Sequence, residues 1–370
     1  MSSPFYLPKL GILGGGQLGR MLVQAAIPFG LDTAVLDPDT NAPCAGLTPQ
    51  FIQGDLMNFE TVYAFGKTVD ILTIEFEHIN TDALAQLESE GTCIYPQPHV
   101  IKTIQDKGLQ KLFYKHHHIP TAPFKLISAP SELKNYPELF PAIQKTRTHG
   151  YDGKGVCSLP NINSLETAFT GLSVLEKHID IHKEFALSIA RNKNGDIALF
   201  PAVDLHFHAQ NHILDTLFCP SDLDPNVLQT AQDIATTLIT ELNLIGLLAI
   251  EFFLCQDGSV LVNEIAPRPH NSGHHTLEGT KTSQFSQLIR AVLNLPLGVT
   301  DITKPSAMIN LLGSDQHPHF LEKCLKIPEV YVHLYGKKQS KPLRKMGHIT
   351  VLANTKQDLQ TKIAHIKEWL

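Results

Sequence analysis

The segment around residue 250 constrains the fold more than any other part of the chain, because it places two glutamates on paired strands. Two runs of apolar, β-forming residues, 250–255 and 260–264, flank an Asp-Gly dipeptide at 257–258. An Asp-Gly dipeptide between such runs is the strongest short signal for a β-hairpin. A two-residue turn at this dipeptide would place Glu251 directly opposite Glu264.

Side chains alternate between the two faces of a strand, so both glutamates are predicted to share one face of this hairpin. With Gln256 paired to Ser259, that face carries Glu251, Phe253, Cys255, Val260, Val262 and Glu264, and the other carries Phe252, Leu254, Gln256, Ser259, Leu261 and Asn263. Like charges that face each other destabilise a sheet unless a proton or a cation separates them. Oxygen ligands favour Mg²⁺ or Mn²⁺ over zinc. The alternative is an ordinary solvated hairpin end.

Composition narrows the class of protein. A chain of 370 residues, of which 43% are hydrophobic, can bury a large core and suggests two or three domains. No run approaches the roughly 18 apolar residues of a membrane span, and Met1–Leu10 lacks a signal-peptide pattern, so we expect a soluble protein. Six scattered cysteines without a CxxC pair suit the reducing cytoplasm. The net charge of −6 gives no indication of nucleic-acid binding.

The N-terminal segment predicts a βαβ unit with a glycine-rich turn. A strand at Leu10–Leu13, the turn Gly14–Gly19, a helix at Arg20–Phe29 and a strand at Thr33–Leu36 that ends at Asp37 satisfy the GxGxxG pattern. An NAD(P)-dependent oxidoreductase, with Asp37 at the ribose, is therefore one hypothesis. Alternatively, the glycines admit another anion to a helix N-terminus, or they only pack the helix against the strand.

Two further charged segments are notable, and each can be read as solvated surface. A strand predicted at Asp70–Glu75 would bring Glu75 to the carboxyl edge of a parallel sheet, where ligands bind, although a surface acid is also possible there. The run Lys337–Lys345 is rich in basic residues and, taken alone, indicates a solvated basic turn.

A glycine-rich loop lies between two predicted strands in the middle of the chain. A helix at about 101–116 leads to strands at 140–145 and 156–159, which flank the sequence TRTHGYDGKG at 146–155. Three glycines and three basic groups could fold over phosphates, although this is not a Walker A loop. A solvated hairpin is the alternative. Strands at 173–176 and 185–190 and a helix at 225–242 then precede the acidic hairpin.

Together these elements resemble the ATP-grasp superfamily over about Ile101–Leu295. The shared features are a strand-ending lysine, a glycine-rich lid, an E-x-x-I segment followed by another acid, and paired glutamates that end in Asn-Glu. The resemblance implies that Lys145 contacts nucleotide phosphates and that Glu184 holds the ribose. It also implies an adenine pocket lined by Glu176–Ile179 through backbone groups, and Mg²⁺ ligation by Glu251 and Glu264.

Longer motifs are similar to those of the N5-carboxyaminoimidazole ribonucleotide synthases over nearly the whole chain. They are GILGGGQLGRM at 11–21, HGYDGKG at 149–155, NEIAPRPHNSGHHT at 263–276, and YGK with RKMGH within 335–348. The resemblance implies an α/β protein with a Rossmann-like pre-ATP-grasp domain (1–102), an ATP-grasp domain (103–296, with a lid at about 122–180) and a small C-terminal domain (297–370). It disfavours the oxidoreductase.

The implied reaction is the ATP-dependent carboxylation of 5-aminoimidazole ribonucleotide with bicarbonate, through carboxyphosphate, in purine biosynthesis. It requires ATP and Mg²⁺ or Mn²⁺, and the family suggests a homodimer. Two alternatives stay open, namely another ATP-grasp ligase that activates a different carboxylate, and a noncatalytic nucleotide-binding module. Arg268 offers a planar fork for bicarbonate or carboxyphosphate, beside His270 and Asn271.

The resemblance also implies individual site residues. Those expected at ATP are Lys107, Lys145, Gly150, Tyr151, Asp152, Gly153, Lys154, Gly155, Val156, Glu176, Lys177, His178, Ile179, Glu184, His208, Asn263 and Glu264. Those expected at the other substrates are Gln17, Leu18, Glu75, Tyr151, Asp152, Lys154, Arg268, His270, Asn271, Ser272, Lys337, Arg344 and Lys345, and the catalytic set is Lys145, Arg268, His270 and Asn271. Lys107 stands where the family usually has arginine. His206 is a rival to His208, because this loop is about two residues longer than usual.

Overall fold

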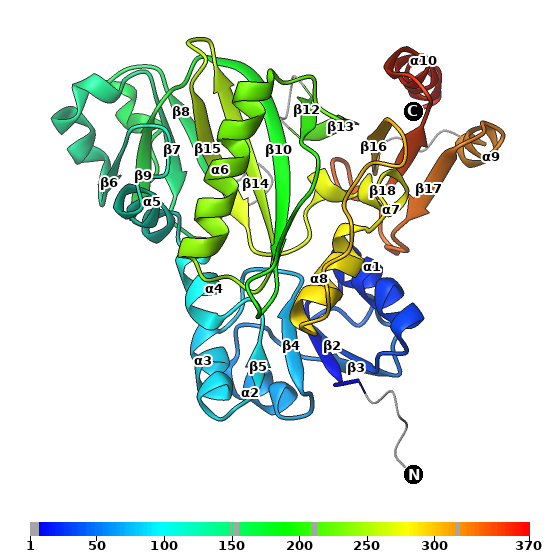
Figure 1. Cartoon of the computed structure of the whole chain (residues 1–370). Helices are drawn as coiled ribbons and strands as arrows, with labels where there is room; N and C mark the ends of the chain where they lie inside the picture. Colours follow the sequence, from blue (N-terminus) through cyan, green and yellow to red (C-terminus); the bar gives the residue numbers. More distant parts are fainter. Residues whose placement is uncertain (1–6, 149, 151–154, 209–212, 315–318) are drawn as a thin grey trace.

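The computed structural model describes residues 7–148, 150, 155–208, 213–314 and 319–370. Figure 1 shows a central sheet with the N-terminal segment below it, a small sheet at the upper left and the C-terminal strands at the upper right. The expectations for Tyr151, Asp152, Gly153 and Lys154 lie outside the described residues.

The N-terminal part is a five-stranded parallel sheet. Its strand order is β3 (Gln50–Gln53), β2 (Thr33–Asp37), β1 (Leu10–Leu13), β4 (Ile71–Ile74), β5 (Cys93–Ile94), with helices α1 (Gln17–Ala26), α2 (Phe59–Gly66) and α3 (Thr81–Ser89). Strands β1 and β4 are buried along their whole length, as expected where helices cover both faces of a parallel sheet. The first helix begins at Gln17, three residues before the predicted start, and a 3₁₀ turn, η1 (Ile27–Phe29), follows it.

The single helix predicted at about 101–116 is wrong, because the structure contains two helices. Helix α4 (Pro98–Gln105) ends at Asp106, which has an extended backbone, and α5 (Lys107–His116) begins immediately after it. The Asp106 side chain caps α5 by accepting hydrogen bonds from the backbone N–H groups of Gly108 and Leu109. The break therefore turns Lys107 into the first residue of a new helix.

A small four-stranded antiparallel sheet follows α5. Its order is β6 (Phe124–Ile127), β9 (Ser173–Lys177), β7 (Ala142–Thr146), β8 (Val156–Leu159), and the 3₁₀ turns η2 (Pro130–Asn135), η3 (Pro137–Leu139) and η4 (Ser164–Glu166) connect its strands. Leu133, Leu139, Leu159 and Leu175 form its own small core. The two strands predicted to flank the glycine-rich loop, β7 and β8, are paired as expected.

The central sheet contains nine strands and continues into the C-terminal part. Its order is β15 (Val260–Ala266), β14 (Gly246–Cys255), β10 (Ile181–Arg191), β12 (Val203–Phe207), β13 (Leu214–Cys219), β16 (Ser306–Leu312), β18 (Lys345–Leu352), β17 (Val330–Leu334), with β11 (Ile197–Leu199) on β10. Helix α6 (Pro225–Glu241) covers β10 and β14 (Figure 1). The other helices are α7 (Thr276–Gly279), α8 (Gln284–Val292), α9 (Phe320–Leu325) and α10 (Lys356–Lys367). Residues of α8 share a core cluster with α1, which joins the two sheets.

The acidic hairpin has the predicted glutamate pair but a different register near its turn. Glu251 faces Glu264, as expected. The turn, however, contains three residues, since Cys255 N–H bonds to Ser259 O at 2.9 Å and Gly258 has φ +84°. The predicted pairing of Gln256 with Ser259 is therefore wrong.

A bulge at Asn263 restores the register before the glutamates are reached. Phe252 pairs with Val262 while Glu251 pairs with Glu264, which leaves Asn263 without a partner in the ladder. Val262 and Val260 consequently pack in the core with Phe252, on the side covered by α6, and not on the glutamate face as predicted.

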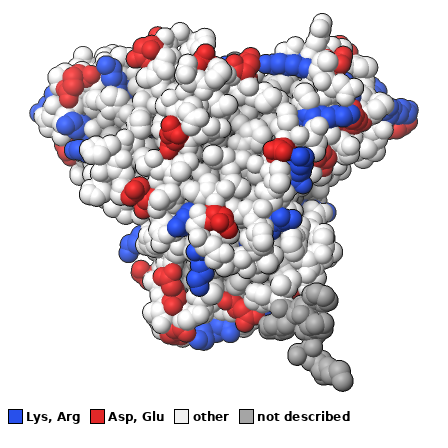
Figure 2. Space-filling model, viewed as in Figure 1, with Lys and Arg blue, Asp and Glu red and all other residues white. Residues whose placement is uncertain are grey.

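The surface shows mixed charge. In Figure 2, acidic and basic side chains are interspersed over the face shown, without a large patch of one sign. None of the helices in the described part of the chain combines the length and the apolar content that crossing a bilayer requires.

Candidate active site

Glu251 and Glu264 form the centre of a charged cluster at the end of the hairpin. Lys107 Nζ lies 3.1 Å from Glu264 Oε2 and lowers the pKa of this carboxyl. Burial raises the pKa of Glu251, and the facing carboxylate of Glu264 raises it further. The pKa values of the two carboxyls are thus shifted in opposite directions, as expected where like charges lie close together.

The bulge gives Asn263 a place in the same cluster. Lys145 Nζ, at the end of β7, donates to Asn263 Oδ1 at 3.1 Å and lies 3.0 Å from Glu176 Oε2. In an ideal hairpin the Asn263 side chain would point away from the glutamates. Because the bulge changes the local backbone, Asn263 can lie in the same cluster as Glu264. The structure therefore brings Lys145, Asn263, Glu264 and Lys107 together, as the sequence predicted.

One buried cation in this cluster was missed by the sequence analysis. Lys111, one turn after Lys107 on α5, lies 3.0 Å from Glu176 Oε1, and its side chain is 3% exposed. Burial alone would raise the pKa of Glu176, but the ammonium groups of Lys145 and Lys111 outweigh it and lower this pKa to about 2. In the sequence Lys111 looks like any solvated lysine on a helix.

Arg268, two residues beyond β15, is held by a carboxylate that the sequence analysis also missed. Its Nε lies 2.8 Å from Glu77 Oε1 and its Nη2 donates to Glu77 Oε2 at 2.9 Å. This fork joins the loop after β15 to the loop after β4. Glu77 lies two residues after Glu75 in the segment EFEH, and this proximity is the sequence signal that points to it.

The segment after Arg268 is fixed from several sides. Gln284 accepts from the His270 N–H and donates to the His270 carbonyl, both at 2.9 Å, while the His270 ring contacts Ser272 Oγ at 2.8 Å and Glu251 Oε1 at 3.7 Å. Asn271, expected at substrate, is buried and exchanges amide hydrogen bonds with Asn310 of β16 at 3.0 and 2.7 Å. Asn271 thus anchors this segment to the C-terminal strands.

The glycine-rich turn at 14–19 is filled by the protein's own acids. Leu18 N–H donates to Glu75 Oε1 at 3.2 Å, and Gly15 N–H donates to Asp37 Oδ2 at 2.6 Å. A Cβ at Gly14 or Gly16 would lie 2.5 or 2.4 Å from a Glu75 oxygen. Glu75 therefore occupies the space in which a dinucleotide fold would hold pyrophosphate, and burial raises its pKa, against the nearby Arg268 cation.

The basic run of the C-terminal part reaches this same turn. Lys337 Nζ donates to Gln17 Oε1 at 2.7 Å and to the Lys345 carbonyl at 2.6 Å. Arg344 donates to the Gln339 carbonyl at 3.0 Å. Lys337 is thus placed beside the N-terminal domain, and not in a freely solvated turn.

The residues expected around the nucleoside are spread over β8, β9, β10 and β12. Lys177 and His178 follow Glu176 and donate their N–H groups to Pro123 O and Pro141 O, at 2.8 and 2.9 Å, before Ile179 leads into β10. Glu184 pairs with Phe253 in the ladder and so lies on the glutamate face of the sheet. Of the residues from 150 to 156 that are expected at ATP, the structure describes Gly150, Gly155, which has φ +76°, and Val156, which begins β8 and is 44% exposed.

The two candidate histidines contact β13 and its neighbouring residues. His208 Nε2 is 3.3 Å from Asp215 Oδ1, and the ring of His206 packs edge-on against Phe218 at 5.4 Å between centroids. These contacts do not favour one histidine over the other as a nucleotide ligand.

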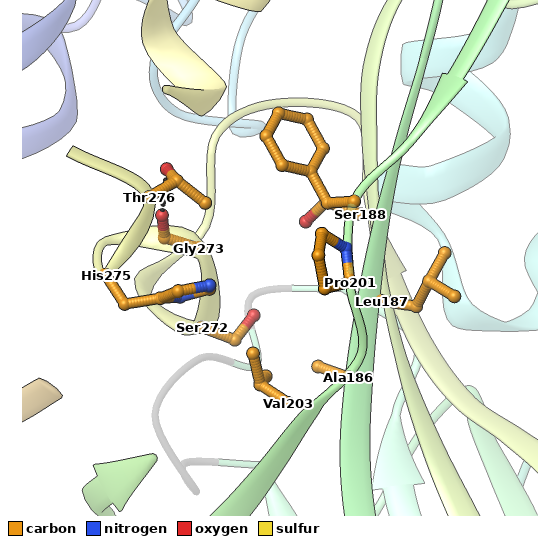
Figure 3. Close-up of a pocket in the computed structure, with 10 residues that line it drawn as sticks. Ala186, Leu187, Ser188, Pro201, Val203, Ser272, Gly273, His275 and Thr276 are labelled. Carbon is orange, nitrogen blue, oxygen red and sulfur yellow. Dashed lines mark hydrogen bonds between the residues drawn. The ribbon is translucent and has the colours of Figure 1, made fainter. Parts of the chain in front are cut away.

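Two cavities lie within the described part of the chain. A cavity of about 10 Å³, room for about one water molecule, lies between β10 and the turn η5 (Asn271–Gly273) (Figure 3). In this view His275 and Ser272 face Ala186, Ser188 and Val203 across it. A second cavity, of about 210 Å³, lies beside Pro220, Asp222 and Lys356. Neither is lined by Glu251 or Glu264.

Comparisons with known proteins agree along the whole chain. Residues 7–105 match the ribonucleotide synthetase pre-ATP-grasp domain, 112–285 the ATP-grasp domain, and 306–362 the phosphoribosylaminoimidazole carboxylase C-terminal domain. The chain is 38% identical to N5-carboxyaminoimidazole ribonucleotide synthase of Bacillus subtilis, over 98% of this chain and 95% of that protein.

Solved structures give the same result. The N5-carboxyaminoimidazole ribonucleotide synthetase of Thermotoga maritima superposes with a TM-score of 0.89 at 38% identity, covering 98% of both chains. The Aspergillus clavatus synthase in complex with ADP and 5-aminoimidazole ribonucleotide has a TM-score of 0.90 at 32% identity, again covering 98% of both. The chain therefore belongs to the N5-carboxyaminoimidazole ribonucleotide synthases, a family of ATP-grasp ligases.

Proposed function

We propose that this enzyme carboxylates 5-aminoimidazole ribonucleotide with bicarbonate at the expense of ATP, in purine biosynthesis. The observation that carries the proposal is that two charged groups lie close together, one at Glu264 on strand β15 and one at Arg268 in the loop that follows β15. Glu264 contacts Lys107 and, four residues later, Arg268 reaches the loop after β4. A nucleotide bound at the first of these groups thus has its phosphates beside a guanidinium suited to a small planar anion.

The donor set fits Mg²⁺. Glu251 and Glu264 provide facing carboxylate oxygens. The described residues contain no group of three or more His, Cys, Asp or Glu that could hold an ion, so this pair would supply only two protein ligands. Two carboxylates completed by phosphates and water are typical of Mg²⁺, and Mn²⁺ prefers similar ligands. When bound, the ion stabilises the charge of the transferring phosphoryl group.

The chain's own cations divide the remaining work. Lys107 and Lys145 bind the phosphates, while Glu184 and the Glu176–Ile179 segment hold the nucleoside. Arg268 positions bicarbonate, with His270 fixed next to it by Gln284 and Ser272. An oxygen of bicarbonate attacks the γ-phosphorus, the bond to ADP breaks, and carboxyphosphate forms. Water that would hydrolyse this intermediate must be excluded while it forms.

The acceptor lies at the turn between the N-terminal and C-terminal domains. Lys337 and Arg344, with Lys345, bind its phosphate, and Gln17 already contacts Lys337. Glu75, with Leu18 beside it, faces the exocyclic amine, which takes the carboxyl group while phosphate leaves. Ser272 and Asn271 hold the segment between the two substrates.

The decisive experiment measures phosphate release from Mg-ATP and bicarbonate, with and without aminoimidazole ribonucleotide. We expect strong stimulation by the ribonucleotide. Glu264→Gln should abolish turnover, whereas Glu88→Gln, an exposed acid on α3, should not change it. Absence of stimulation in the wild-type protein would refute the proposed function. Replacing bicarbonate with formate distinguishes a ligase for another acid, because only such a ligase would keep its rate.

Two broader properties are proposed from the family. We expect a homodimer, which light scattering measures as twice the chain mass. We also expect a cytoplasmic enzyme, consistent with six cysteines that are all free thiols. A monomer in solution would refute the first expectation without affecting the reaction.

A further inference from the structure

Lys111 is the most deeply enclosed cation in the charged cluster, and the reaction described above gives it no role. Its ammonium contacts Glu176 Oε1 at 3.0 Å and lies 5.8 and 5.9 Å from the ring centroids of Tyr114 and Phe124. It also donates to Thr121 Oγ1, which in turn donates to the Val262 carbonyl at 2.8 Å. With a side chain that is 3% exposed, Lys111 cannot reach a ligand without disrupting these contacts.

Lys145 differs from Lys111 although both bind the same carboxylate. Lys145 takes the other oxygen of Glu176, at 3.0 Å, but its side chain is 13% exposed and also contacts Asn263. Asn263 precedes Glu264 on the bulge, so Lys145 already faces the acidic pair. Lys145 is therefore the partner that can move, and Lys111 is the partner that stays.

The charge on Glu176 makes this difference consequential. Glu176 is 4% exposed. Leaving a buried carboxylate without any counter-ion is strongly destabilising. If Lys145 is to bind a phosphate, another cation must neutralise Glu176. Within the described residues, Lys111 is the second cation in contact with Glu176.

We propose that Lys111 is a positioning residue for ATP, a fixed counter-ion of Glu176 that allows Lys145 to exchange this carboxylate for a nucleotide phosphate. The inference rests on the proposed ATP site and deepens it. Lys111 does not touch the nucleotide. It lowers the free-energy cost of separating Lys145 from Glu176. Less of the binding free energy of the phosphates is then lost to this separation.

Calorimetric titration with Mg-ATP, without bicarbonate or aminoimidazole ribonucleotide, tests the proposal independently of the full reaction. Lys111→Met removes the charge and keeps the length of the side chain, so Lys145 becomes the only counter-ion of Glu176. We expect the Kd for ATP to rise about 10- to 100-fold, the effect of one charge-assisted hydrogen bond. Lys115→Met, at an exposed position one turn later on α5, is the matched control and should leave the Kd unchanged.

Glu176→Gln provides the rescue that a merely structural role would not give. Once residue 176 is neutral, Lys145 is no longer retained, and adding Lys111→Met should change the Kd less than about twofold. An equally large loss in the Glu176→Gln background would overturn the proposal, because Lys111 would then act on the nucleotide itself. An unchanged Kd in folded Lys111→Met would also overturn it. If Lys111→Met alone does not fold, the comparison of the double variant with Glu176→Gln still decides. No ATP binding by the wild-type protein would instead refute the ATP site.

Discussion

Glu77→Gln tests whether the fork between Arg268 and Glu77 prepares the site for bicarbonate. Glu77 Oε2 accepts a hydrogen bond from Arg268 Nη2 at 2.9 Å, and Glu77 Oε1 lies 2.8 Å from Arg268 Nε in the same ion pair. A glutamine keeps one oxygen and turns an N–H group toward the second N–H donor of the guanidinium. One charge-assisted hydrogen bond is lost, which costs about 1.5–3 kcal/mol. The two side chains are only 16% and 22% exposed, so water compensates little of this loss.

If the fork holds Arg268 in its working position, this cost appears in the reaction. We expect kcat/KM for bicarbonate to fall about 10- to 160-fold. The assay varies bicarbonate at saturating Mg-ATP and aminoimidazole ribonucleotide, and the KM for ATP should change less than about twofold. Glu138→Gln, at an exposed position, serves as control. An unchanged or higher kcat/KM in a variant with the wild-type melting temperature would falsify the reasoning, since Arg268 would then need no support from Glu77.

Two further predictions concern stability. Asp106 caps α5 and also binds Arg147 through both carboxylate oxygens. Asp106→Ala should therefore lower the free energy of opening the first turn of α5 by about 2–4 kcal/mol. Asp106→Asn keeps the cap, so this loss should be about 1 kcal/mol smaller. Amide exchange at Gly108 and Leu109 measures this, and equal exchange in both variants would contradict it. The pKa of Glu176 is about 2 in the folded protein and 4.5 when exposed, so its ionised form stabilises the fold fully above pH 4.5 and loses this effect as the pH falls toward 2. The gap in melting temperature between wild type and Glu176→Gln should therefore shrink between pH 5 and pH 3, and a constant gap would contradict the assigned pKa.

In the acidic hairpin the predicted pairing of Glu251 with Glu264 is confirmed, although the turn length from which it was predicted is wrong. Alternation and Asp-Gly predicted that Glu251 faces Glu264, and the structure confirms it. The turn is nevertheless one residue longer than predicted, and the bulge at Asn263 compensates by one residue. Turn length depends on the backbone conformation at Gly258, and a bulge leaves no mark in hydrophobic periodicity, so neither could be predicted from the sequence.

Partners that lie far apart in the chain were the main omission. Lys111 and Glu77 each have the residue type of a solvated surface position, and only the tertiary structure places them against Glu176 and Arg268. Lys107 and Lys145 could be chosen as candidates because a family motif marks their positions, and the structure places both at the end of the acidic hairpin. Fold class and family could thus be predicted from motifs, while the ion pairs that orient the site could not.

The glycine-rich turn shows the same limit in a motif that is usually trusted. GxGxxG predicts an anion near a helix N-terminus, and in the structure the carboxyl group of Glu75 of the same chain lies there. Because the Glu75 side chain fills the space of the turn at 14–19, the N-terminus of α1 helps to hold this carboxyl group at the domain boundary. Lys337 of the C-terminal part meets Gln17 at this boundary, and Arg268 of the ATP-grasp part lies close enough to oppose the raised pKa of Glu75. A turn that binds a cofactor in other folds is here the place where residues of all three domains meet.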